Sequence, residues 1–407
     1  MVSIDDMEIK PGVVPEERKV KPRSVVKGTD RYIVGQIEPF DQKEEIFKRS
    51  TWDPSLLELA KKYYARFDGQ AMPQDRDGYT LKEMALSMAG WHIALDFGSG
   101  QFVGGEGTEA WEAWPVGRTD TTRVPKGMLA NISGPEEATR LVKRAARLYG
   151  ASLVGTCILD RRWLYSHSYH TLKKEHEPID IPREYNYAIV MAHEMDYDAM
   201  ERAPSFIADA AASAIYSKMP ITGAMLAQYI RGLGYQAIPM INDTANSVPL
   251  AIDAGLGELS RMGVLMTPEY GPRVRLHKVF TDMPLVPDEP IDFGVWDFCL
   301  KCQQCAKYCP GQAIPRTPPT AKINDSYNRE GLLRWPLKAE SCFSFMARSD
   351  TDCGVCIRVC PFNKPPAKLH DMVRWGVKRT PWLNSGFLQG DKWMGHWKRA
   401  APQHFWE

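Results

Sequence analysis

The spacing of apolar residues in the second hundred of the chain predicts an amphipathic helix. Ser133 is the expected N-cap, Pro135 lies in the first turn, and Glu136 completes a capping box. The helix is expected to run to Gly150. Its apolar residues recur at intervals of three or four positions, as a single buried face requires: Ala138, Leu141, Val142, Ala145 and Leu148.

Short apolar runs bounded by turn residues predict four buried strands. The first is 151–159, in which Cys157 acts as a small hydrophobic residue. The others are 235–241, 264–267 and 273–281. Helical stretches lie between them, so we expect mixed content of the α+β or α/β class.

Two other helical regions complete this pattern. Residues 204–219 are Ala-rich and helical, Pro220 is expected to break or kink them, and a second helix ends at Gly232. Nearer the N-terminus, residues 52–67 predict an amphipathic helix.

Alternation along the strand 273–281 separates two kinds of side chain. One face carries the basic residues Arg273, Arg275 and His277, and the other carries Val274 and Leu276. A positively charged face is therefore expected to adjoin an apolar core.

The composition narrows the class of protein. The chain has 407 residues, 44% of them hydrophobic and 25% charged, with a formal net charge of +1. This composition excludes a disordered or collagen-like chain, and the length favours two or three structural units. A near-zero charge gives no long-range field toward nucleic acid. No apolar stretch is long enough for a spanning helix, and the N-terminus lacks the features of a secretion signal, so we expect a soluble protein that is cytoplasmic or has lost an export peptide.

The cysteines carry the strongest chemical signal. They form C-x2-C-x2-C-x3-C-P followed by C-x10-C-x2-C-x3-C-P, with the members Cys299, Cys302, Cys305, Cys309, Cys342, Cys353, Cys356 and Cys360. Zinc sites use separated pairs of ligands, whereas three closely spaced thiolates and a displaced fourth suit 4Fe-4S clusters. The fourth cysteine of such a run ligates the other cluster, which predicts a crossed pattern. Cys299, Cys302, Cys305 and Cys360 would then hold one cluster, and Cys309, Cys342, Cys353 and Cys356 the second.

Three runs of sequence resemble one known family. They are YIRGLGYQAIP, AIDAGLGELSRMGVLMTPEYGPRVRLHKVFTDMPL and the cluster motif ending CIRVCPFNKP, within about 187–366. Together they resemble the corrinoid-dependent reductive dehalogenases of organohalide-respiring bacteria. The resemblance implies a nitroreductase-like corrinoid-binding core followed by a ferredoxin-like unit with two 4Fe-4S clusters. It also implies a corrinoid bound base-off, and the sequence has no D-x-H-x-x-G motif that would supply a histidine to cobalt.

The resemblance also suggests the site residues. The positions that match the family's proton-donating tyrosine and its asparagine and arginine are Tyr216, Asn242 and Arg275. A tyrosine is a neutral acid at pH 7, and a nearby cation would stabilise the phenolate that remains after proton transfer. Gly255 and Gly257 would let the backbone approach the corrinoid closely, although an ordinary helix-to-loop transition explains a lone G-x-G equally well.

The expected organisation follows from these assignments. An N-terminal unit (1–132) precedes the corrinoid-binding core (133–295), which carries an insertion near 160–186. The two-cluster unit (296–366) and a tryptophan-rich docking tail (367–407) follow.

The hypothesis is a reductive dehalogenase that releases halide from a small organohalide, with electrons passing through both clusters to a Co(I) corrinoid. Family practice implies a membrane-anchor partner, an external electron donor, a homodimer, and a location at the outer face of the cytoplasmic membrane, with the cytoplasm as the alternative. No nucleic-acid partner is expected. The alternatives are an epoxyqueuosine-reductase-like tRNA-modification enzyme, disfavoured by the neutral charge balance, and a non-enzymatic two-cluster electron carrier.

Two groups of residues give weaker signals. The stretch containing His167, His170 and His176 has no common metal-ligand spacing, and its lysines favour a solvated loop or helix. Tryptophans are expected to line an apolar substrate pocket, and the candidates are Trp52, Trp91 and Trp382.

Overall fold

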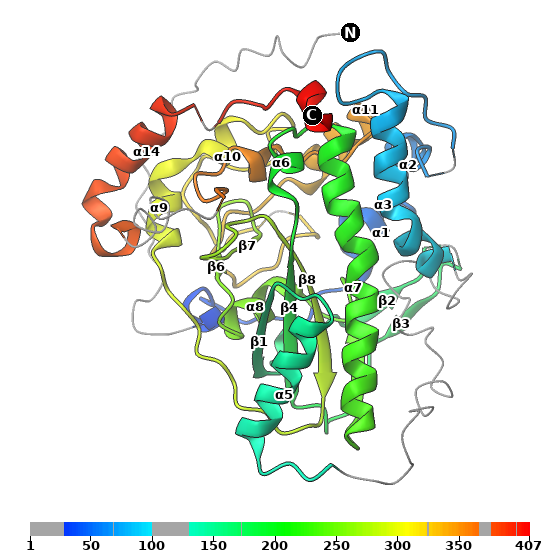
Figure 1. Cartoon of the computed structure of the whole chain (residues 1–407), viewed down its shortest axis with the longest axis vertical. Helices are drawn as coiled ribbons and strands as arrows, with labels where there is room; N and C mark the ends of the chain where they lie inside the picture. The colour runs from blue at the N-terminus through cyan, green and yellow to red at the C-terminus, as the bar shows by residue number, and fades with distance from the viewer. Residues whose placement is uncertain are drawn as a thin grey trace.

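The computed structural model describes residues 28–67, 69–99, 130–171, 173–323, 325–365, 376–395 and 397–407. Figure 1 shows a central sheet with the long helix α7 beside it, and the cysteine-bearing helices gathered beyond one end of the sheet. The charged N-terminal segment and Trp375 lie outside the described residues.

The central sheet has four strands, and all of its pairings are antiparallel. Its order is β1 (Leu153–Ile158), β4 (Tyr187–Glu194), β8 (Val274–Thr281) and β5 (Ala237–Met240). Three of the four predicted strands therefore form this sheet. The predicted strand at 264–267 instead belongs to a small separate pair, β6 (Glu258–Leu259) with β7 (Leu265–Met266).

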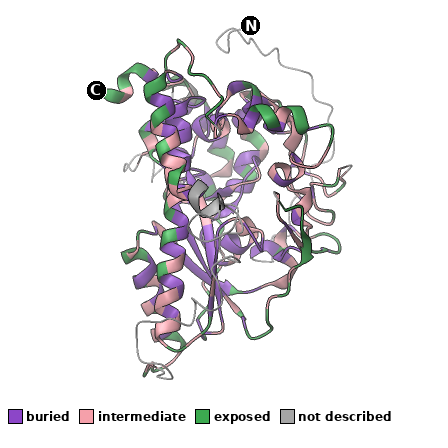
Figure 2. Ribbon diagram, turned by 90° about the vertical axis from the view of Figure 1, so that its right-hand side faces the viewer, coloured by how far each residue is buried: buried purple, intermediate pink, exposed green. Residues whose placement is uncertain are grey.

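Helices cover both faces of the sheet, whose strands are largely buried in Figure 2. On one face, Ile189, Met191 and Val279 pack against α5 (Pro135–Leu148) and the C-terminal half of α7 (Phe206–Gly232). The opposite face belongs to the larger core that contains α8 (Ser247–Asp253). Cys157 is buried there and donates its thiol to the carbonyl of Leu250, so the prediction of a small core residue is confirmed.

Helix α5 forms where predicted, but its start and its last turn differ from the prediction. The N-cap is Gly134, and the backbone N–H and hydroxyl of Ser133 donate to Glu137 rather than Glu136. Leu148 is 72% exposed, because the helix ends there and the buried stripe runs instead through Ala146.

A break or a kink was predicted at Pro220. Helix α7 continues through Pro220 to Gly232, so a break is wrong and the predicted end is confirmed. Proline lacks the N–H that would bond to the carbonyl of Tyr216 one turn earlier. Burial of most of the helix against the sheet and α3 supplies the stability that offsets this lost bond.

Helix α3 (Leu81–Ser99) packs along α7 at very short range. A Cβ atom at Gly90 would lie 2.1 Å from the Ser213 hydroxyl oxygen and 3.1 Å from the backbone nitrogen of Ala214. Ser217 donates its hydroxyl to the carbonyl of Gly90 at 2.6 Å. The absence of a side chain at Gly90 therefore sets how closely α3 approaches α7.

We expect Gly90→Ala to destabilise the protein by about 1–3 kcal/mol, because the added methyl group overpacks the contact between α3 and α7. Denaturant unfolding of the purified protein measures this. Gly386→Ala is the matched control, since no atom lies within 4 Å of the added Cβ. Equal stability of the two variants would contradict the proposed role of Gly90.

The remaining elements that precede α7 are short. They are η2 (Gly28–Arg31), η3 (Gln42–Glu44), α1 (Ile46–Arg49), α2 (Leu57–Tyr64), η4 (Arg161–Trp163), β2 (His167–Tyr169), β3 (His176–Pro178) and α6 (Tyr197–Met200). The predicted helix at 52–67 is thus shorter than expected. The histidine-rich stretch forms an antiparallel ribbon, not the loop or helix favoured from its lysines.

The cysteine-rich region and the tail consist of short helices. They are α9 (Val295–Cys302), α10 (Gln304–Lys307), α11 (Ala339–Ser349), α12 (Val355–Arg358), η5 (Pro381–Leu383), α14 (Asn384–Trp393) and η6 (Pro402–Trp406). In the tail, the Trp397 ring stacks on Tyr308, and the Trp406 indole donates to Glu83. The described part of the tail therefore docks on the body. Among the described residues, no helix combines the length and apolar character needed to cross a bilayer.

Candidate active site and cysteine clusters

The three residues suggested for catalysis come together from separate elements. Asn242, two residues beyond β5, donates its side-chain amide to the hydroxyl oxygen of Tyr216 at 3.1 Å. The guanidinium carbon of Arg275, on β8, lies 5.3 Å from the centre of the Tyr216 ring. All three side chains are partly buried. The phenol oxygen thus accepts one hydrogen bond and a cation lies over the ring, which leaves the phenol proton available to a ligand.

Trp91 stacks on Tyr216 and ties it to a buried acid. The two rings lie 5.1 Å apart with an interplanar angle of 20°. The Trp91 indole N–H points to Asp209 at 3.4 Å, and the hydroxyl of Ser87 also donates to Asp209. Asp209 lies two turns before Tyr216 on α7, so one helix face carries both. The tyrosine ring is therefore fixed by neighbours from α3 and α7.

A buried arginine links this network to the cysteine-rich region. Arg66 pairs with Asp209 at 3.5 Å and with Asp352 at 2.8 Å, and Tyr63 donates its hydroxyl to Asp352. Burial raises the pKa of Asp209, and Arg66 opposes that shift. Burial also acts to raise the pKa of Asp352, but the charge of Arg66 and the hydrogen bonds from Tyr63 and Arg66 together outweigh burial, and the net shift is downward. Asp352 directly precedes Cys353, so the network connects α7 with a cysteine ligand candidate.

A histidine pair lies on the same sheet face as Arg275. The Nε2 atoms of His193 and His277 are 3.0 Å apart, and β4 pairs with β8 so that His193 faces Arg275. Burial lowers the pKa of His193 to about 4 and that of His277 well below its usual value. The predicted positively charged face is therefore wrong at His277, because a buried imidazole stays neutral at pH 7.

Arg273 serves a different purpose from Arg275. Its side chain is fully buried, and it pairs with Glu194 at 2.5 Å. Its Nε atom donates to the side-chain oxygen of Asn363 at 2.9 Å. Arg273 therefore fastens the start of β8 to the segment that follows the last cysteine.

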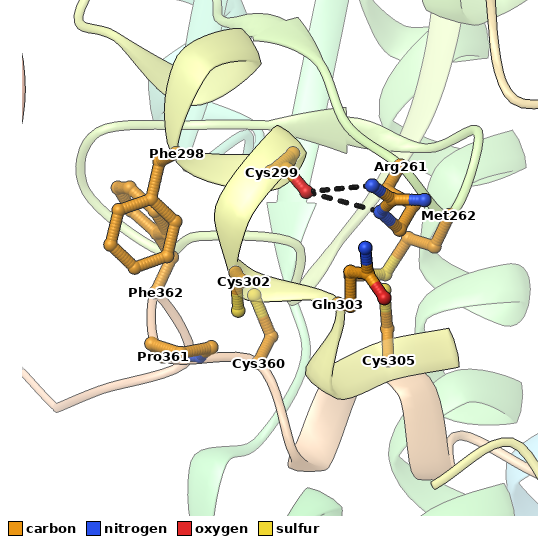
Figure 3. A pocket seen from close by; sticks show the side chains of 10 residues that line it. All are labelled: Arg261, Met262, Phe298, Cys299, Cys302, Gln303, Cys305, Cys360, Pro361 and Phe362. Carbon is orange, nitrogen blue, oxygen red and sulfur yellow. Dashed lines mark hydrogen bonds between the residues drawn. The ribbon is translucent and has the colours of Figure 1, made fainter. Parts of the chain in front are cut away.

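Four of the eight motif cysteines line one pocket. Figure 3 shows Cys299, Cys302, Cys305 and Cys360 around it, and they are the set expected for the first cluster. Arg261 is buried beside them and donates from Nε and Nη2 to the carbonyl of Cys299 at 3.1 and 3.0 Å. Three of these cysteines come from α9 and α10, and the fourth follows α12, so sequence-distant segments meet at this pocket.

The other four cysteines form a second group. The charges of Cys356 and Cys309 act on the Cys342 thiol, and those of Cys356, Cys342 and Cys309 act on the Cys353 thiol, so the four thiols lie within electrostatic reach of one another. The backbone N–H of Ala313 donates to the Cys309 sulfur at 3.2 Å. Burial, then the charge of Cys309, raises the pKa of the Cys356 thiol to about 11, and the charge of Arg275 opposes this shift. The second group therefore lies within electrostatic reach of the candidate catalytic arginine.

Both groups suit iron–sulfur clusters chemically. Burial raises the pKa of the Cys299 thiol to about 11 and that of Cys302 to about 12. Thiolates are unfavourable in such surroundings unless a cation compensates their charge, and the iron of a cluster supplies that compensation. Two groups of four thiols match the requirement of two cubanes.

Gly255 and Gly257 are explained by contacts within the protein. Gly255 has a φ of +71°, and a Cβ there would lie 2.6 Å from the carbonyl oxygen of Glu289. At Gly257 it would lie 2.1 Å from the carbonyl oxygen of Met266 on β7. The close approach that these glycines permit is to the chain's own backbone, and their contact with a corrinoid stays a prediction.

Comparisons with known proteins identify the family. Residues 298–363 match the model of the 4Fe-4S double cluster binding domain. The tetrachloroethene reductive dehalogenase of Sulfurospirillum multivorans is 37% identical over 372 residues, which cover 84% of this chain and 73% of that protein. The chain belongs to the reductive dehalogenase family. The family prediction is therefore confirmed.

Solved structures of the family share the fold. A variant of the N-terminally tagged catabolic reductive dehalogenase NpRdhA superposes with a TM-score of 0.72 at 22% identity. A second reductive dehalogenase structure, described as suggesting a mechanism for B12-dependent dehalogenation, superposes with a TM-score of 0.69 at 23% identity. Each match covers 94% of this chain and 49% of the solved chain, so the chain spans about half the length of these structures.

The sequence prediction missed part of the site. Of the candidate pocket tryptophans, Trp91 stacks on Tyr216, whereas Trp382 is 71% exposed and Trp52 donates its indole N–H to the carbonyl of Lys43. The network through Arg66 and Asp352 was not predicted, because its members are far apart in sequence and no motif connects them.

Proposed function

We propose that the chain is a corrinoid-dependent reductive dehalogenase that removes halogen as halide from a small organohalide. The observation that carries this proposal is that Arg275 lies over the Tyr216 ring while its charge also acts on the Cys356 thiol. A proton donor, a cation and an electron-carrying centre would thereby meet at one place, as a reductive cleavage requires. The named activity of the Sulfurospirillum relative makes a chloroethene the first substrate to test.

A corrinoid fits the chemistry of this place. The Nε atom of Arg275 is buried and has no hydrogen-bond partner in the part of the chain that the structure describes. An unpaired buried donor is costly, so a ligand with acceptor oxygens, such as the amide side arms of a corrinoid, would satisfy it. The description of one solved relative as B12-dependent supports the same cofactor. When bound, a corrinoid supplies the cobalt that cleaves the carbon–halogen bond.

The residues of the chain would manage the proton. Because Asn242 donates to the phenol oxygen of Tyr216, the phenol hydrogen is free to pass to the substrate carbon. Arg275 would stabilise the phenolate that forms, and Trp91 would hold the ring in place and exclude water from one side. A solvent proton would then restore the phenol.

The finer details of the fold and cofactors belong to the same proposal. The sheet region would be the nitroreductase-like core, with the corrinoid bound base-off, and the cysteine-rich region a ferredoxin-like unit. The group of Cys309, Cys342, Cys353 and Cys356 would hold the cluster nearer to Arg275. The group of Cys299, Cys302, Cys305 and Cys360 would hold the cluster that receives electrons from outside. The domain limits stay those expected from the sequence.

The partners and location also remain proposals. Family membership supports an external electron donor, a membrane-anchor protein and a homodimer at the outer face of the cytoplasmic membrane. No nucleic-acid partner is proposed, because the net charge of +1 offers no phosphate-binding field.

Anaerobic reconstitution tests the proposed function. Protein assembled with corrinoid, iron and sulfide should contain cobalt and iron and should release halide from chlorinated ethenes when a low-potential reductant is supplied. Corrinoid-free protein is the control and should release none. Iron without bound cobalt would favour the electron carrier instead, and salt-sensitive retention on a tRNA column would favour the tRNA-modification enzyme.

A further inference from the structure

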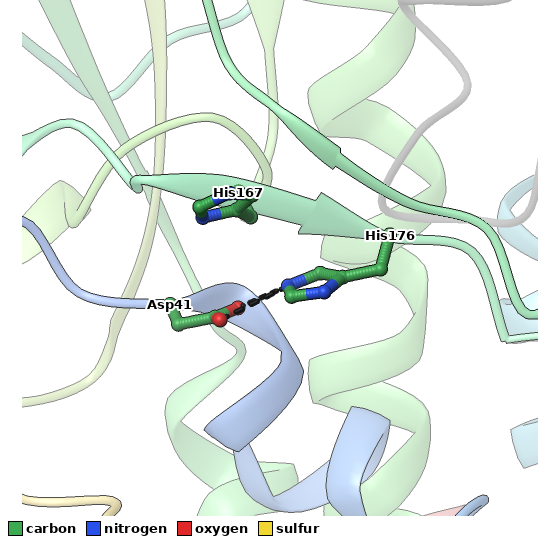
Figure 4. A group of neighbouring side chains, drawn as sticks. All are labelled: Asp41, His167 and His176. Carbon is green, nitrogen blue, oxygen red and sulfur yellow. Dashed lines mark hydrogen bonds and ion pairs between the residues drawn. The ribbon is translucent and has the colours of Figure 1, made fainter.

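We propose that Asp41, His167 and His176 form a zinc site that fastens the β2–β3 ribbon to the N-terminal segment. One potential ligand atom from each residue lies within 4.8 Å of the others. Figure 4 shows the three side chains converging from η3 and the ribbon. The site is separate from the proposed catalytic function, because its three residues make none of the described contacts with Tyr216, Asn242, Arg275 or the motif cysteines.

The fold brings these residues together by specific local contacts. In the ribbon, His167 pairs with Pro178 and Tyr169 pairs with His176, so both histidines project from one face. Asp41 is the N-cap of η3 and accepts from the backbone N–H of Lys43 at 2.9 Å. The backbone N–H of Tyr169 donates to the Gln42 side chain at 3.1 Å, which holds η3 against β2.

The ligand types suit zinc. Two imidazoles and a carboxylate form a common three-residue zinc set, with water completing the tetrahedron. The His176 Nε2 atom lies 3.0 Å from both carboxylate oxygens of Asp41. Zinc–ligand bonds of about 2.0–2.1 Å place neighbouring ligand atoms about 3.3 Å apart. Small side-chain rotations would therefore convert the present arrangement into a coordination sphere.

An ion pair between His176 and Asp41 does not explain why His167 lies beside them. The His167 ring lies 4.7 Å from that of His176, and its Nδ1 atom is 3.1 Å from the Ser166 hydroxyl, a contact that restricts the ring. Two adjacent imidazoles repel each other when protonated, whereas a shared metal ion holds both in the neutral form.

Solvent can reach the site, and a nearby lysine is engaged elsewhere. The side chains of Asp41 and His176 are each 33% exposed, which gives a metal ion access and leaves room for water. The amine of Lys43 lies over the rings of Trp52 and Tyr169, at 4.7 and 5.7 Å from their centres.

Zinc binding to the holoprotein tests the proposal. Untagged protein with both clusters assembled is titrated with Zn²⁺ in a chelator buffer, and bound zinc is measured by mass spectrometry. We expect one zinc per chain, an absorption-edge spectrum with nitrogen and oxygen ligands only, and a higher melting temperature with zinc. His167→Gln, His176→Gln and Asp41→Asn should each weaken binding by about tenfold or more and remove the thermal shift.

The variants are chosen to preserve the fold. Asparagine is as good an N-cap as aspartate, so Asp41→Asn keeps the start of η3. His404→Gln is the matched control, since His404 pairs with Glu407 at 2.9 Å but belongs to no three-ligand group in the described chain, and it should bind zinc normally. Equal zinc uptake by all variants, absence of zinc from the wild type, or sulfur ligands in the spectrum would each overturn the proposal.

Discussion

Tyr216→Phe is expected to lower the rate of halide release by about 10²–10⁴-fold, the usual contribution of a positioned general acid. The substitution removes only the hydroxyl group, so the ring keeps its stacking on Trp91 and its contact with Arg275. Iron and cobalt content should therefore stay at the wild-type level. Steady-state halide release with a chlorinated ethene, together with metal analysis of the same preparation, measures both quantities.

Tyr229→Phe is the matched control for this experiment. Tyr229 also lies on α7. It packs against the hydrophobic cluster between the sheet and α5, away from Asn242 and Arg275. Its loss of a hydroxyl should leave turnover near the wild-type rate. If Tyr216→Phe also retained most of its turnover, the proton would have to come from another group, and the proposed role of Asn242 as its hydrogen-bond donor would fail with it.

Local sequence signals predicted much of the fold. Apolar patterns located α5 and three of the four strands of the main sheet, but β4 was not predicted. The points at which helices end or break were less predictable. Leu148 fits the helical repeat yet is 72% exposed, because the helix ends there and its buried stripe runs through Ala146 instead. Pro220 signals a break, but tertiary packing of α7 overrides it.

The candidate site likewise has features that the sequence predicted and features that it did not. Cysteine spacing is a local signal, and in the structure four of the motif cysteines line one pocket, while the assignment of each cysteine to a cluster stays a prediction. The pair of Arg66 and Asp209 joins residues 143 positions apart, and nothing in the sequence near either residue specifies the other. Likewise, His167 and His176 meet Asp41 only because a ribbon forms where the composition favoured a solvated loop. Long-range polar contacts of this kind depend on the completed fold.

Pairs of cysteine substitutions are expected to reveal the crossed ligation directly. If Cys299 and Cys360 serve the same cluster, replacing both by alanine should remove one cluster and leave about half of the iron. Replacing Cys299 and Cys309 together should remove both clusters and nearly all of the iron, because each substitution then affects a different one. Both double variants should lose halide release, since the electron path is interrupted in each.

Iron content per chain after anaerobic reconstitution separates this arrangement from the uncrossed one. If each motif held its own cluster, the pair Cys299 and Cys309 would leave half of the iron and the pair Cys299 and Cys360 would leave almost none. Cys157→Ala is the control, because this buried cysteine packs beside Leu250 in the sheet core and should leave both clusters intact. The crossed pattern also predicts that Cys309→Ala perturbs the cluster beside Arg275, whereas Cys360→Ala perturbs the one beside Arg261. The opposite result would assign Cys309 to the cluster beside Arg261 and Cys360 to the cluster beside Arg275, as the uncrossed arrangement requires.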